Sequence, residues 1–256
     1  MKFAFTAVLL CISIITKAQE PYIVEILADE QYPPYSYVED GKLKGVYINL
    51  VTKAAQLLAP TYQVKLVAMP WKRALAQIEN GKAFAILPPY KHPELRPFIF
   101  PYSTPLHEEN VAVYCHRNFN LSIFFEAESK KRPANLGINS GYIILDDKYV
   151  DAVENNRIVI RENKSTQSNI KKLLKGRIDC YANDELTITF SLKAESANTS
   201  IYKLYEKKDT IGAHTAHIGY SNVLPEQFPY KADFIEKMNS AIMNIKDEHS
   251  IDSLME

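Results

Sequence analysis

Arg96 stands in a segment whose composition is unusual for a plain surface loop, AILPPYKHPELRPFIFPYSTPL. It is the single arginine of this segment and lies among prolines and aromatic residues. An apolar run, residues 84–87, precedes the loop, and a further apolar segment follows it. A lone arginine is most often a solvated surface residue. The alternative is a fixed positive charge held at a site, and other parts of the chain decide between the two.

Histidines and acids close to this loop have the residue types of acid–base chemistry. His92, His107 and His116 lie near one another in sequence, and Glu108 and Glu109 follow His107. A histidine–glutamate pair in a closed, desolvated cleft could transfer protons. Solvated loop histidines are the simpler interpretation, so we predict no catalytic residue and no enzyme. An enzyme stays open as the main alternative.

His214 and His217 form an H-x-x-H pair, which is one spacing of metal ligands. On a strand, residues three apart point to opposite faces, so we expect no metal site there. The sequence has no G-x-S-x-G motif, no phosphate-binding loop and no Cys–His pair of catalytic spacing. We therefore expect neither a metal nor a cofactor.

The first 18 residues have the pattern of a secretion signal. Lys2 precedes an apolar run, residues 3–15, that is too short for a stable membrane anchor. Small residues at positions 16 and 18 predict cleavage after Ala18. Cys11 follows a leucine, where a lipoprotein signal needs a small residue, so a membrane-anchored form is the less favoured alternative.

The chain beyond the signal has room for one large or two small domains. Without Lys2 and Lys17 it carries 28 basic and 30 acidic residues, which gives no basic surface for nucleic acid or an anionic membrane. No later segment approaches 18 consecutive apolar residues, so we expect a soluble chain. Cys115 and Cys180 remain, and the sequence allows either a disulfide or two buried thiols.

Strands and helices alternate along this part of the chain. The predicted strands are residues 22–28, 62–68, 83–87, 108–117, 133–139, 156–162 and 177–183. The predicted helices are residues 46–58, 71–80, 166–175, 184–195 and 225–246. Asp40-Gly41 predicts a tight turn, and Ser165 or Thr166 a helix cap. Two series of alternating strands and helices favour two α/β lobes with parallel sheets, and residues 108–117 are the best candidate for a strand that crosses between them.

Residues able to contact a ligand fall at the ends of these strands. In open parallel sheets, ligands bind beyond the carboxyl ends of the strands. The residues found there are Asp29, Glu30, Gln31, Tyr32, Trp71, the loop from Tyr90 to Arg96, Ser140, Gly141, Tyr142 and Asp184. Tyr32 and Trp71 could simply cover apolar core, and Asp184 could simply cap a helix. Aromatics, one arginine and one carboxylate at five strand ends instead favour a ligand site.

The order of these segments resembles the extracellular solute-binding proteins of family 3, the polar-amino-acid-binding proteins of ABC transporters, from residue 22 to about residue 246. ADEQYPPYSYVEDGKLKGVYINLV is similar to the family's opening strand, aromatic–proline–aromatic turn and first helix. GKAFAILPPYKHPELRPFIFPYSTPL is similar to its arginine loop, and LLKGRIDCYANDE to its second-lobe strand. The resemblance implies a type II periplasmic-binding-protein fold: two parallel-sheet, Rossmann-like α/β lobes joined by a two-strand hinge.

The resemblance also implies roles for individual residues. Tyr32 and Trp71 match the aromatics that sandwich the ligand. Arg96 matches the arginine that binds an α-carboxylate, which suits the planar fork of a guanidinium. Asp184 matches the carboxylate that receives an α-ammonium when the lobes close. The predicted ligand-binding residues are Asp29, Tyr32, Trp71, Tyr90, Arg96, Gly141, Tyr142 and Asp184.

Some positions depart from the family pattern. The family usually places serine or threonine before the arginine, where this chain has Pro88, Pro89, Lys91 and Pro93. Prolines donate no backbone hydrogen bond. After Gly141 a serine or threonine is usual, and here a tyrosine follows. We therefore expect that the ligand need not be a free amino acid, and that a larger, flatter or acylated carboxylate would suit this lining.

The resulting hypothesis is a periplasmic binding protein, secreted through the inner membrane of a Gram-negative bacterium. Residues 1–18 form the signal, 19–108 and 213–256 the first lobe, and 109–212 the second. The protein is expected to be a monomer that closes on a small carboxylate and delivers it to an ABC permease, with no nucleic-acid partner. Two alternatives stay open: a sensor that presents its closed form to a membrane receptor, and a dehydratase-like enzyme acting on a cyclic carboxylate.

Overall fold

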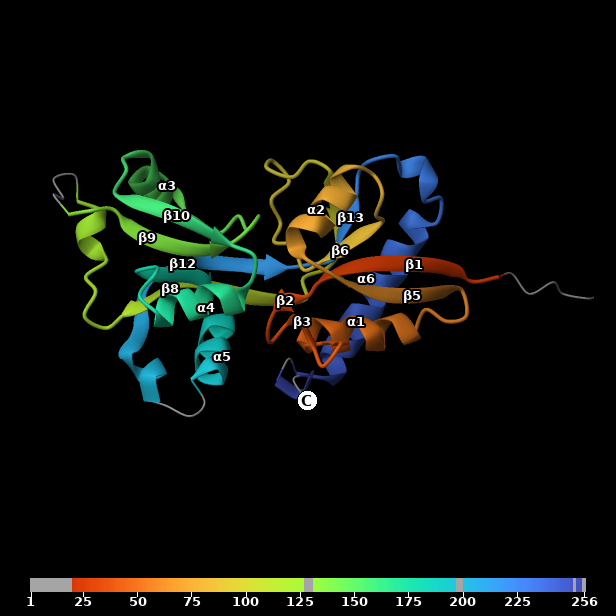
Figure 1. Ribbon diagram of the computed structural model, residues 1–256. Helices are drawn as coiled ribbons and strands as arrows, with labels where there is room; N and C mark the ends of the chain where they lie inside the picture. The colour runs from red at the N-terminus through yellow and green to blue at the C-terminus, as the bar shows by residue number, and fades with distance from the viewer. Residues whose placement is uncertain (1–19, 127–130, 197–199, 251, 255–256) are drawn as a thin grey trace, which may run out of the picture.

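The computed structural model describes residues 20–126, 131–196, 200–250 and 252–254. The expected signal peptide lies outside this part of the chain. Two lobes lie side by side, each built on its own five-stranded sheet (Figure 1). Across the described ranges, no helix is both long and apolar enough to span a membrane. The predicted architecture of two α/β lobes is therefore confirmed.

The first lobe contains the amino-terminal strands and the carboxyl-terminal helix. Its sheet consists of β1 (Tyr22–Asp29), β5 (Tyr62–Met69), β6 (Ala85–Leu87), β7 (Ile99–Tyr102) and β13 (Gly219–Ser221), in the order β5-β1-β6-β13-β7. Its helices are α1 (Val46–Gln56), α2 (Trp71–Glu79) and α6 (Lys231–Glu248). β1 pairs in parallel with β5 and β6. Ile26 packs in the core that α1 and α6 share, whereas its neighbour Leu27 packs against α2, so helices cover both faces of the sheet.

A small hairpin sheet precedes α1 and reaches toward the second lobe. It consists of β2 (Gln31–Tyr32), β3 (Ser36–Glu39) and β4 (Lys42–Lys44). Asp40 and Gly41 connect β3 to β4 with φ angles of 50° and 73°, so the predicted tight turn is confirmed. Gly45 then leads into α1 with a φ of 124°. A Cβ at Gly45 would lie 2.3 Å from the carbonyl oxygen of Tyr35, so only glycine fits there.

The second lobe contains the middle of the chain. Its sheet consists of β8 (His107–His116), β9 (Ala134–Asn139), β10 (Ile158–Asn163), β11 (Cys180–Asp184) and β12 (Tyr205–Ala216), in the order β10-β9-β11-β8-β12. Its helices are α3 (Asp147–Glu154), α4 (Thr166–Leu174) and α5 (Glu185–Glu195). The side chain of Ser165 accepts the backbone N–H of Ser168 and caps α4, which decides between the two predicted caps.

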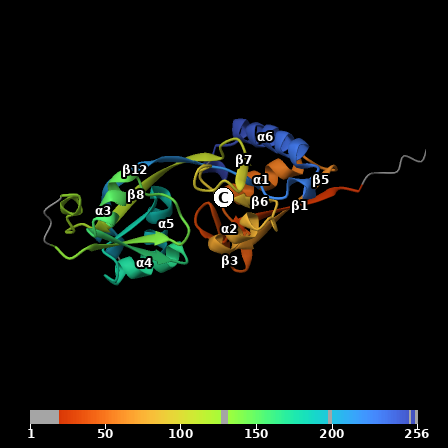
Figure 2. The ribbon, with the colours of Figure 1, turned by 90° about the horizontal axis from the view of Figure 1, so that it is seen from above.

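Two long strands connect the lobes. β8 and β12 pair antiparallel along their length, from the pair of His116 with Tyr205 to the pair of His107 with Ala216 (Figures 1 and 2). β8 is the crossing strand that the sequence predicted at residues 108–117. The predicted lobe boundaries at 108/109 and 212/213 fall inside these two strands.

Two helical predictions differ from the structure. The last helix was expected from residue 225 but begins at Lys231, because Pro225–Gln227 form a separate 3-10 turn. Phe228 follows that turn with a φ of -125° and a ψ of 67°, which no continuous helix could include. The sequence analysis missed α3, a helix of only 8 residues whose buried side chains are limited to Tyr149 and Ala152. Such a short apolar stripe gives a weak periodic signal.

Cys115 and Cys180 form a disulfide within the second lobe. The two residues are register partners on the antiparallel strands β8 and β11, and both are buried. Of the two possibilities left open by the sequence, the structure therefore shows the disulfide. The bond ties the crossing strand to the interior of the second lobe.

Replacing both Cys115 and Cys180 by alanine should lower the free energy of unfolding by about 2–5 kcal/mol, because the bond closes a loop with a sequence separation of 65. Urea unfolding of residues 19–256 measures the change. A reducing agent should lower the urea midpoint of the wild-type protein and leave that of the double variant unchanged. Two reactive thiols in oxidised, denatured wild-type protein would contradict the disulfide.

Candidate functional site

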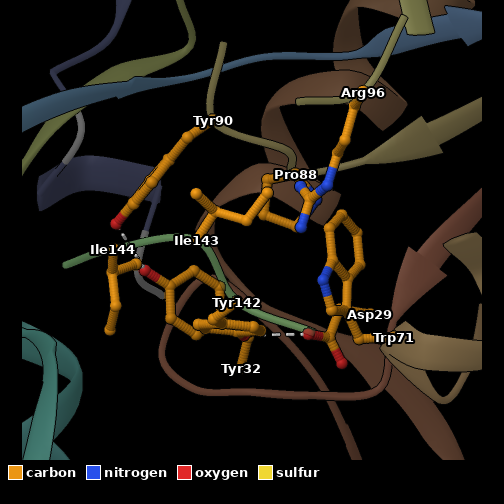
Figure 3. A pocket seen from close by; sticks show the side chains of 9 residues that line it. All are labelled: Asp29, Tyr32, Trp71, Pro88, Tyr90, Arg96, Tyr142, Ile143 and Ile144. Carbon is orange, nitrogen blue, oxygen red and sulfur yellow. Dashed lines mark hydrogen bonds between the residues drawn. The ribbon is translucent and has the colours of Figure 1, made fainter. Parts of the chain in front are cut away.

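A pocket lies between the two lobes, beyond the carboxyl ends of β1, β6 and β9 (Figure 3). Its cavity volume is about 20 Å³, enough for about one water molecule, and the space between its atoms is about 310 Å³ when open solvent is included. The first lobe contributes Asp29, Tyr32, Trp71, Pro88, Tyr90 and Arg96, and the second contributes Tyr142, Ile143 and Ile144. The pocket thus combines one permanent cation, one carboxyl and a mostly aromatic and aliphatic wall.

Arg96 is a buried charge, not a solvated surface residue, since only 6% of its surface is exposed. Its Nη2 donates to the carbonyl oxygen of Gly141 in the second lobe at 2.5 Å. Its guanidinium carbon lies 5.6 Å from the ring centroid of Trp71. Burial lowers the pKa of Arg96, but a guanidinium keeps its charge in proteins. No carboxylate of the described residues forms an ion pair with it.

Trp71 forms the side of the pocket next to Arg96. It is the first residue of α2, directly after the N-cap residue Pro70, and it is the single tryptophan of the chain. Its indole Nε1 donates to the carbonyl oxygen of Gly141 at 3.4 Å. Trp71 and Arg96 therefore contact the same carbonyl group of the opposite lobe.

Asp29 and Tyr142 form a second link between the lobes. The hydroxyl of Tyr142 donates to Oδ2 of Asp29 at 3.0 Å, while the backbone N–H of Gln31 donates to Oδ1 at 2.9 Å. Burial raises the pKa of Asp29 to about 7, although both hydrogen bonds act in the opposite direction. The ring of Tyr142 packs edge-on against Tyr32 at 5.7 Å. Tyr142 thus occupies the middle of the pocket.

Tyr32 and Tyr90 form the wall opposite Arg96, and a buried acid holds both. Tyr90 donates to Oε2 of Glu109 at 2.5 Å, and Tyr32 donates to the same oxygen. Tyr47 of α1 donates to Oε1 at 2.5 Å. The sequence analysis named Glu109 only as a neighbour of the histidines, because nothing in the sequence shows that three distant tyrosines meet there.

Asp184, the expected acceptor of an α-ammonium, does not line this pocket. Its side chain accepts the backbone N–H of Thr187 at 3.0 Å and so caps α5. It also accepts the hydroxyl of Tyr35 at 3.1 Å. The helix cap that the sequence analysis gave as the plain alternative is therefore present. Gly141 contributes its carbonyl oxygen to Arg96 and Trp71, and lies at a φ of 81°.

Three residues of the pocket were not predicted as ligand contacts: Pro88, Ile143 and Ile144. Pro88 was noted only as a departure from the family pattern. The two isoleucines follow Tyr142, and an apolar pair in a loop carries no signal that separates a pocket wall from core.

The histidines lie outside the pocket lining. The ring of His214 stacks on Tyr90 with centroids 4.9 Å apart, and His92 lies 5.7 Å from His214. His217 bonds through one ring nitrogen to the carbonyl oxygen of Ser103 at 2.7 Å. In the ranges that the structure describes, no group of three or more histidines, cysteines or acids is arranged to hold a metal ion.

Comparison with known proteins supplies the family and the fold. The family model described as bacterial extracellular solute-binding proteins, family 3, matches residues 24–256. A search of curated proteins finds no match. An ancestral arginine-binding protein bound to arginine has a similar structure, with a TM-score of 0.70 and 14% identity, covering 92% of this chain and 97% of that one.

Two further structures are similar over almost the whole chain. A histidine kinase sensor domain with similarity to periplasmic binding proteins has a TM-score of 0.71 at 12% identity, covering 92% of this chain and 95% of that one. The ancestral amino-acid-binding protein AncCDT-1, a precursor of cyclohexadienyl dehydratase, has a TM-score of 0.66 at 17% identity, with coverages of 91% and 92%. At such identities these matches show a shared fold.

The variant Asp29→Asn should flatten the pH dependence of stability. Because burial raises the pKa of Asp29 from 3.8 to about 7, the folded protein binds this proton more tightly than the unfolded chain does. The resulting stability is complete below pH 4 and is lost as the pH rises through 7, up to roughly 4 kcal/mol by pH 8. Urea unfolding at pH 5 and pH 8 measures the part of this loss that falls between the two pH values, roughly 2–3 kcal/mol.

We expect the wild-type protein to lose more free energy of unfolding between pH 5 and pH 8 than Asp29→Asn does. The matched control is Asp247→Asn, since Asp247 is exposed on α6. Equal losses in the wild type and Asp29→Asn would show that Asp29 does not hold a proton in the folded protein.

Proposed function

The chain belongs to the bacterial extracellular solute-binding proteins of family 3, and we propose that it captures a small carboxylate, an amino acid or an amino-acid derivative, in the pocket between its lobes. The observation that carries this proposal is Arg96, a buried cation without an ion-pair partner in the described part of the chain. Burying a charge is costly unless a counter-charge or hydrogen bonds compensate it. A ligand carboxylate supplies both.

The guanidinium of Arg96 keeps donors for that interaction. A guanidinium has five N–H donors, and the side-chain hydrogen bond described for Arg96 uses one of them, from Nη2 to the Gly141 carbonyl. A carboxylate can accept two parallel N–H bonds from the remaining donors. Trp71 packs beside the guanidinium and excludes water from one side, which strengthens the attraction.

Lobe closure completes the site in this proposal. Gly141 and Tyr142 of the second lobe contact Arg96, Trp71 and Asp29 of the first. Contacts between residues of different lobes form only when the lobes have closed, so these contacts stabilise the closed state. A ligand that contacts both walls shifts the equilibrium toward that state.

Asp29 is the carboxyl group we assign to a cationic group of the ligand. Asp184 is bound to Thr187 and Tyr35, whereas Asp29 lines the pocket. An ammonium beside Asp29 would favour its ionised form and would replace the proton that burial retains. The proline and isoleucine lining offers no donors of its own from side chains, which suits an apolar or acylated portion of the ligand.

We further propose the periplasm as the location, reached with the amino-terminal signal and cleavage after Ala18, and an ABC permease as the recipient of the ligand. A membrane receptor is the alternative recipient, supported by the likeness to a histidine kinase sensor domain. Permease and ATPase genes beside the gene of this protein would favour transport, and a receptor gene would favour sensing.

An enzyme is the second candidate function, and Asp29 is the observation that favours it. A carboxyl in the pocket with a pKa of about 7 is suited to donate or accept a proton near neutral pH. One similar structure belongs to a precursor of cyclohexadienyl dehydratase. Turnover of a cyclic carboxylate that is lost in Asp29→Asn would establish this function in place of binding alone.

A thermal-shift screen of residues 19–256 tests the proposed function. It uses amino acids, N-acyl amino acids, small peptides and cyclic carboxylates, because a ligand that binds only the folded protein raises its melting temperature. We expect a rise with one carboxylate class and none with the corresponding amides. A screen in which no carboxylate raises the melting temperature would count against the proposal.

Substitution of the guanidinium should weaken the best carboxylate of that screen. Arg96→Lys is expected to raise its dissociation constant at least about tenfold, since a point charge cannot replace a bidentate fork. Isothermal titration calorimetry measures the constant. Arg73→Lys, at an exposed position of α2, is the matched control and should bind like the wild type. Equal affinity in Arg96→Lys would remove Arg96 from the site.

A further inference from the structure

Glu109 is a buried carboxyl on the crossing strand β8, directly behind the pocket wall. It is 1% exposed. Three hydroxyls from three parts of the first lobe meet on it: Tyr32 of β2, Tyr47 of α1 and Tyr90, which follows β6. Two of these tyrosines line the pocket. One carboxyl on a connecting strand therefore holds a whole wall of the site.

The groups that surround Glu109 do not neutralise it by an ion pair. Asp184 approaches from the second lobe, and the hydroxyl of Tyr35 joins that side chain at 3.1 Å. His214 is the register partner of Glu109 on β12, and its ring stacks on Tyr90. Within the ranges described, neither a lysine nor an arginine nor a histidine forms an ion pair with Glu109.

Protonation of Glu109 changes the hydrogen bonds of the pocket wall. An ionised carboxylate only accepts, so all three tyrosines direct their hydrogens to it. A protonated carboxyl donates one hydrogen, and one tyrosine hydroxyl must then turn away. The hydroxyl oxygens of Tyr32 and Tyr90 lie 3.3 Å apart, so the displaced hydrogen can bond between them. The proton thus determines which hydrogens the wall presents to a ligand.

We propose that Glu109 is a positioning residue of the cleft: one proton on its carboxyl favours the closed arrangement of the lobes, and loss of that proton favours opening. Glu109 lies on β8 of the second-lobe sheet, whereas its three hydroxyl partners belong to the first lobe. Closure therefore packs these tyrosines over the carboxyl and removes it from water, and a carboxyl removed from water favours its protonated form. The inference rests on the proposed hinge closure and not on the identity of the ligand.

The electrostatics of the closed cleft agree with this role. Burial, and then the charge of Asp184, raise the pKa of Glu109 to about 8, although the three tyrosines act in the opposite direction. The carboxyl therefore holds its proton at neutral pH and loses it in mildly alkaline solution. Below that pH the closed form is favoured, and the preference is lost as the pH rises through about 8.

The test needs no ligand. The full chain after the signal, residues 19–256, is labelled with ¹³C at its glutamate carboxyls and titrated from pH 5 to pH 9.5 by NMR. The fluorescence of Trp71, the single tryptophan, is recorded over the same range, because its indole contacts the second lobe. We expect one glutamate to titrate near pH 8, far above the ordinary value of about 4.3, and the fluorescence to follow it.

Substitutions at four positions assign the effect to Glu109. Glu109→Gln should remove the high titration and flatten the fluorescence curve, whereas the neighbouring exposed Glu108→Gln should change neither. Asp29 also titrates in the cleft, so the fluorescence is measured again in an Asp29→Asn background. Tyr47→Phe removes a donor to Glu109 without changing the pocket lining, and should move the midpoint upward by about half a pH unit or more.

Specific outcomes would overturn the proposal. The first is that no glutamate titrates above pH 6. The second is a fluorescence signal that is flat, or that keeps its pH dependence in the Glu109→Gln protein with Asp29→Asn. If Glu109→Gln does not fold, an unmoved midpoint in Tyr47→Phe overturns it equally. A thermal-shift screen without a bound carboxylate would instead refute the proposed function and leave this result standing.

Discussion

The uncompensated charge of Arg96 is the interaction on which the geometry of the cleft depends. A guanidinium that is 6% exposed needs hydrogen-bond acceptors, and the structure provides one from the opposite lobe, the carbonyl of Gly141. The hydrogen bond between Arg96 and Gly141 therefore connects the two lobes. A carboxylate offers two charged oxygens where the carbonyl offers one neutral oxygen, so an anionic ligand can compete for the fork while the lobes stay together.

The carboxyls around the cleft are buried acidic groups without a positive partner in the described part of the chain, the reverse of the buried cation Arg96. Asp29 and Glu109 are both 1% exposed, and neither has a cationic partner within the described residues. Tyrosine hydroxyls compensate part of the cost, and bound protons the rest, since burial raises both pKa values. Burial also raises the pKa of Asp184, and there the backbone N–H groups of a helix N-terminus and the hydroxyl of Tyr35 act in the opposite direction. The site thus holds its acids by hydroxyl donors, bound protons and a helix N-terminus, and the raised pKa values of Asp29 and Glu109 lie near neutrality.

Much of the fold follows from local patterns in the sequence. The alternation of strands and helices, the Asp40-Gly41 turn and the crossing strand at residues 108–117 depend on short-range signals, and the structure agrees with them. The arginine loop and the aromatics at strand ends could likewise be placed at one cleft, because parallel strands share a carboxyl edge. The cluster on Glu109 could not, since Tyr32, Tyr47 and Tyr90 become neighbours only through tertiary packing. The role of Asp184 could not be predicted from the sequence either. An aspartate at the end of a strand and the start of a helix suits both a helix cap and a ligand contact, so its residue type and position do not separate the two.

The crossing strand β8 carries both the disulfide of the second lobe and the glutamate that the tyrosines of the first lobe contact. Cys115, near its far end, is fixed to β11 by the disulfide, so that end moves with the second lobe. Glu109, near its other end, is held by three tyrosines of the first lobe. β12 pairs alongside, with register shifts between Lys207 and Asp209 and between Thr210 and Gly212, and such irregularities let a strand bend. In the proposed closure, the pair bends between these two ends, one held by a covalent bond and one by hydrogen bonds. Only the hydrogen-bonded end can change with a proton, and the role proposed for Glu109 uses these hydrogen bonds to couple the hinge to the pocket.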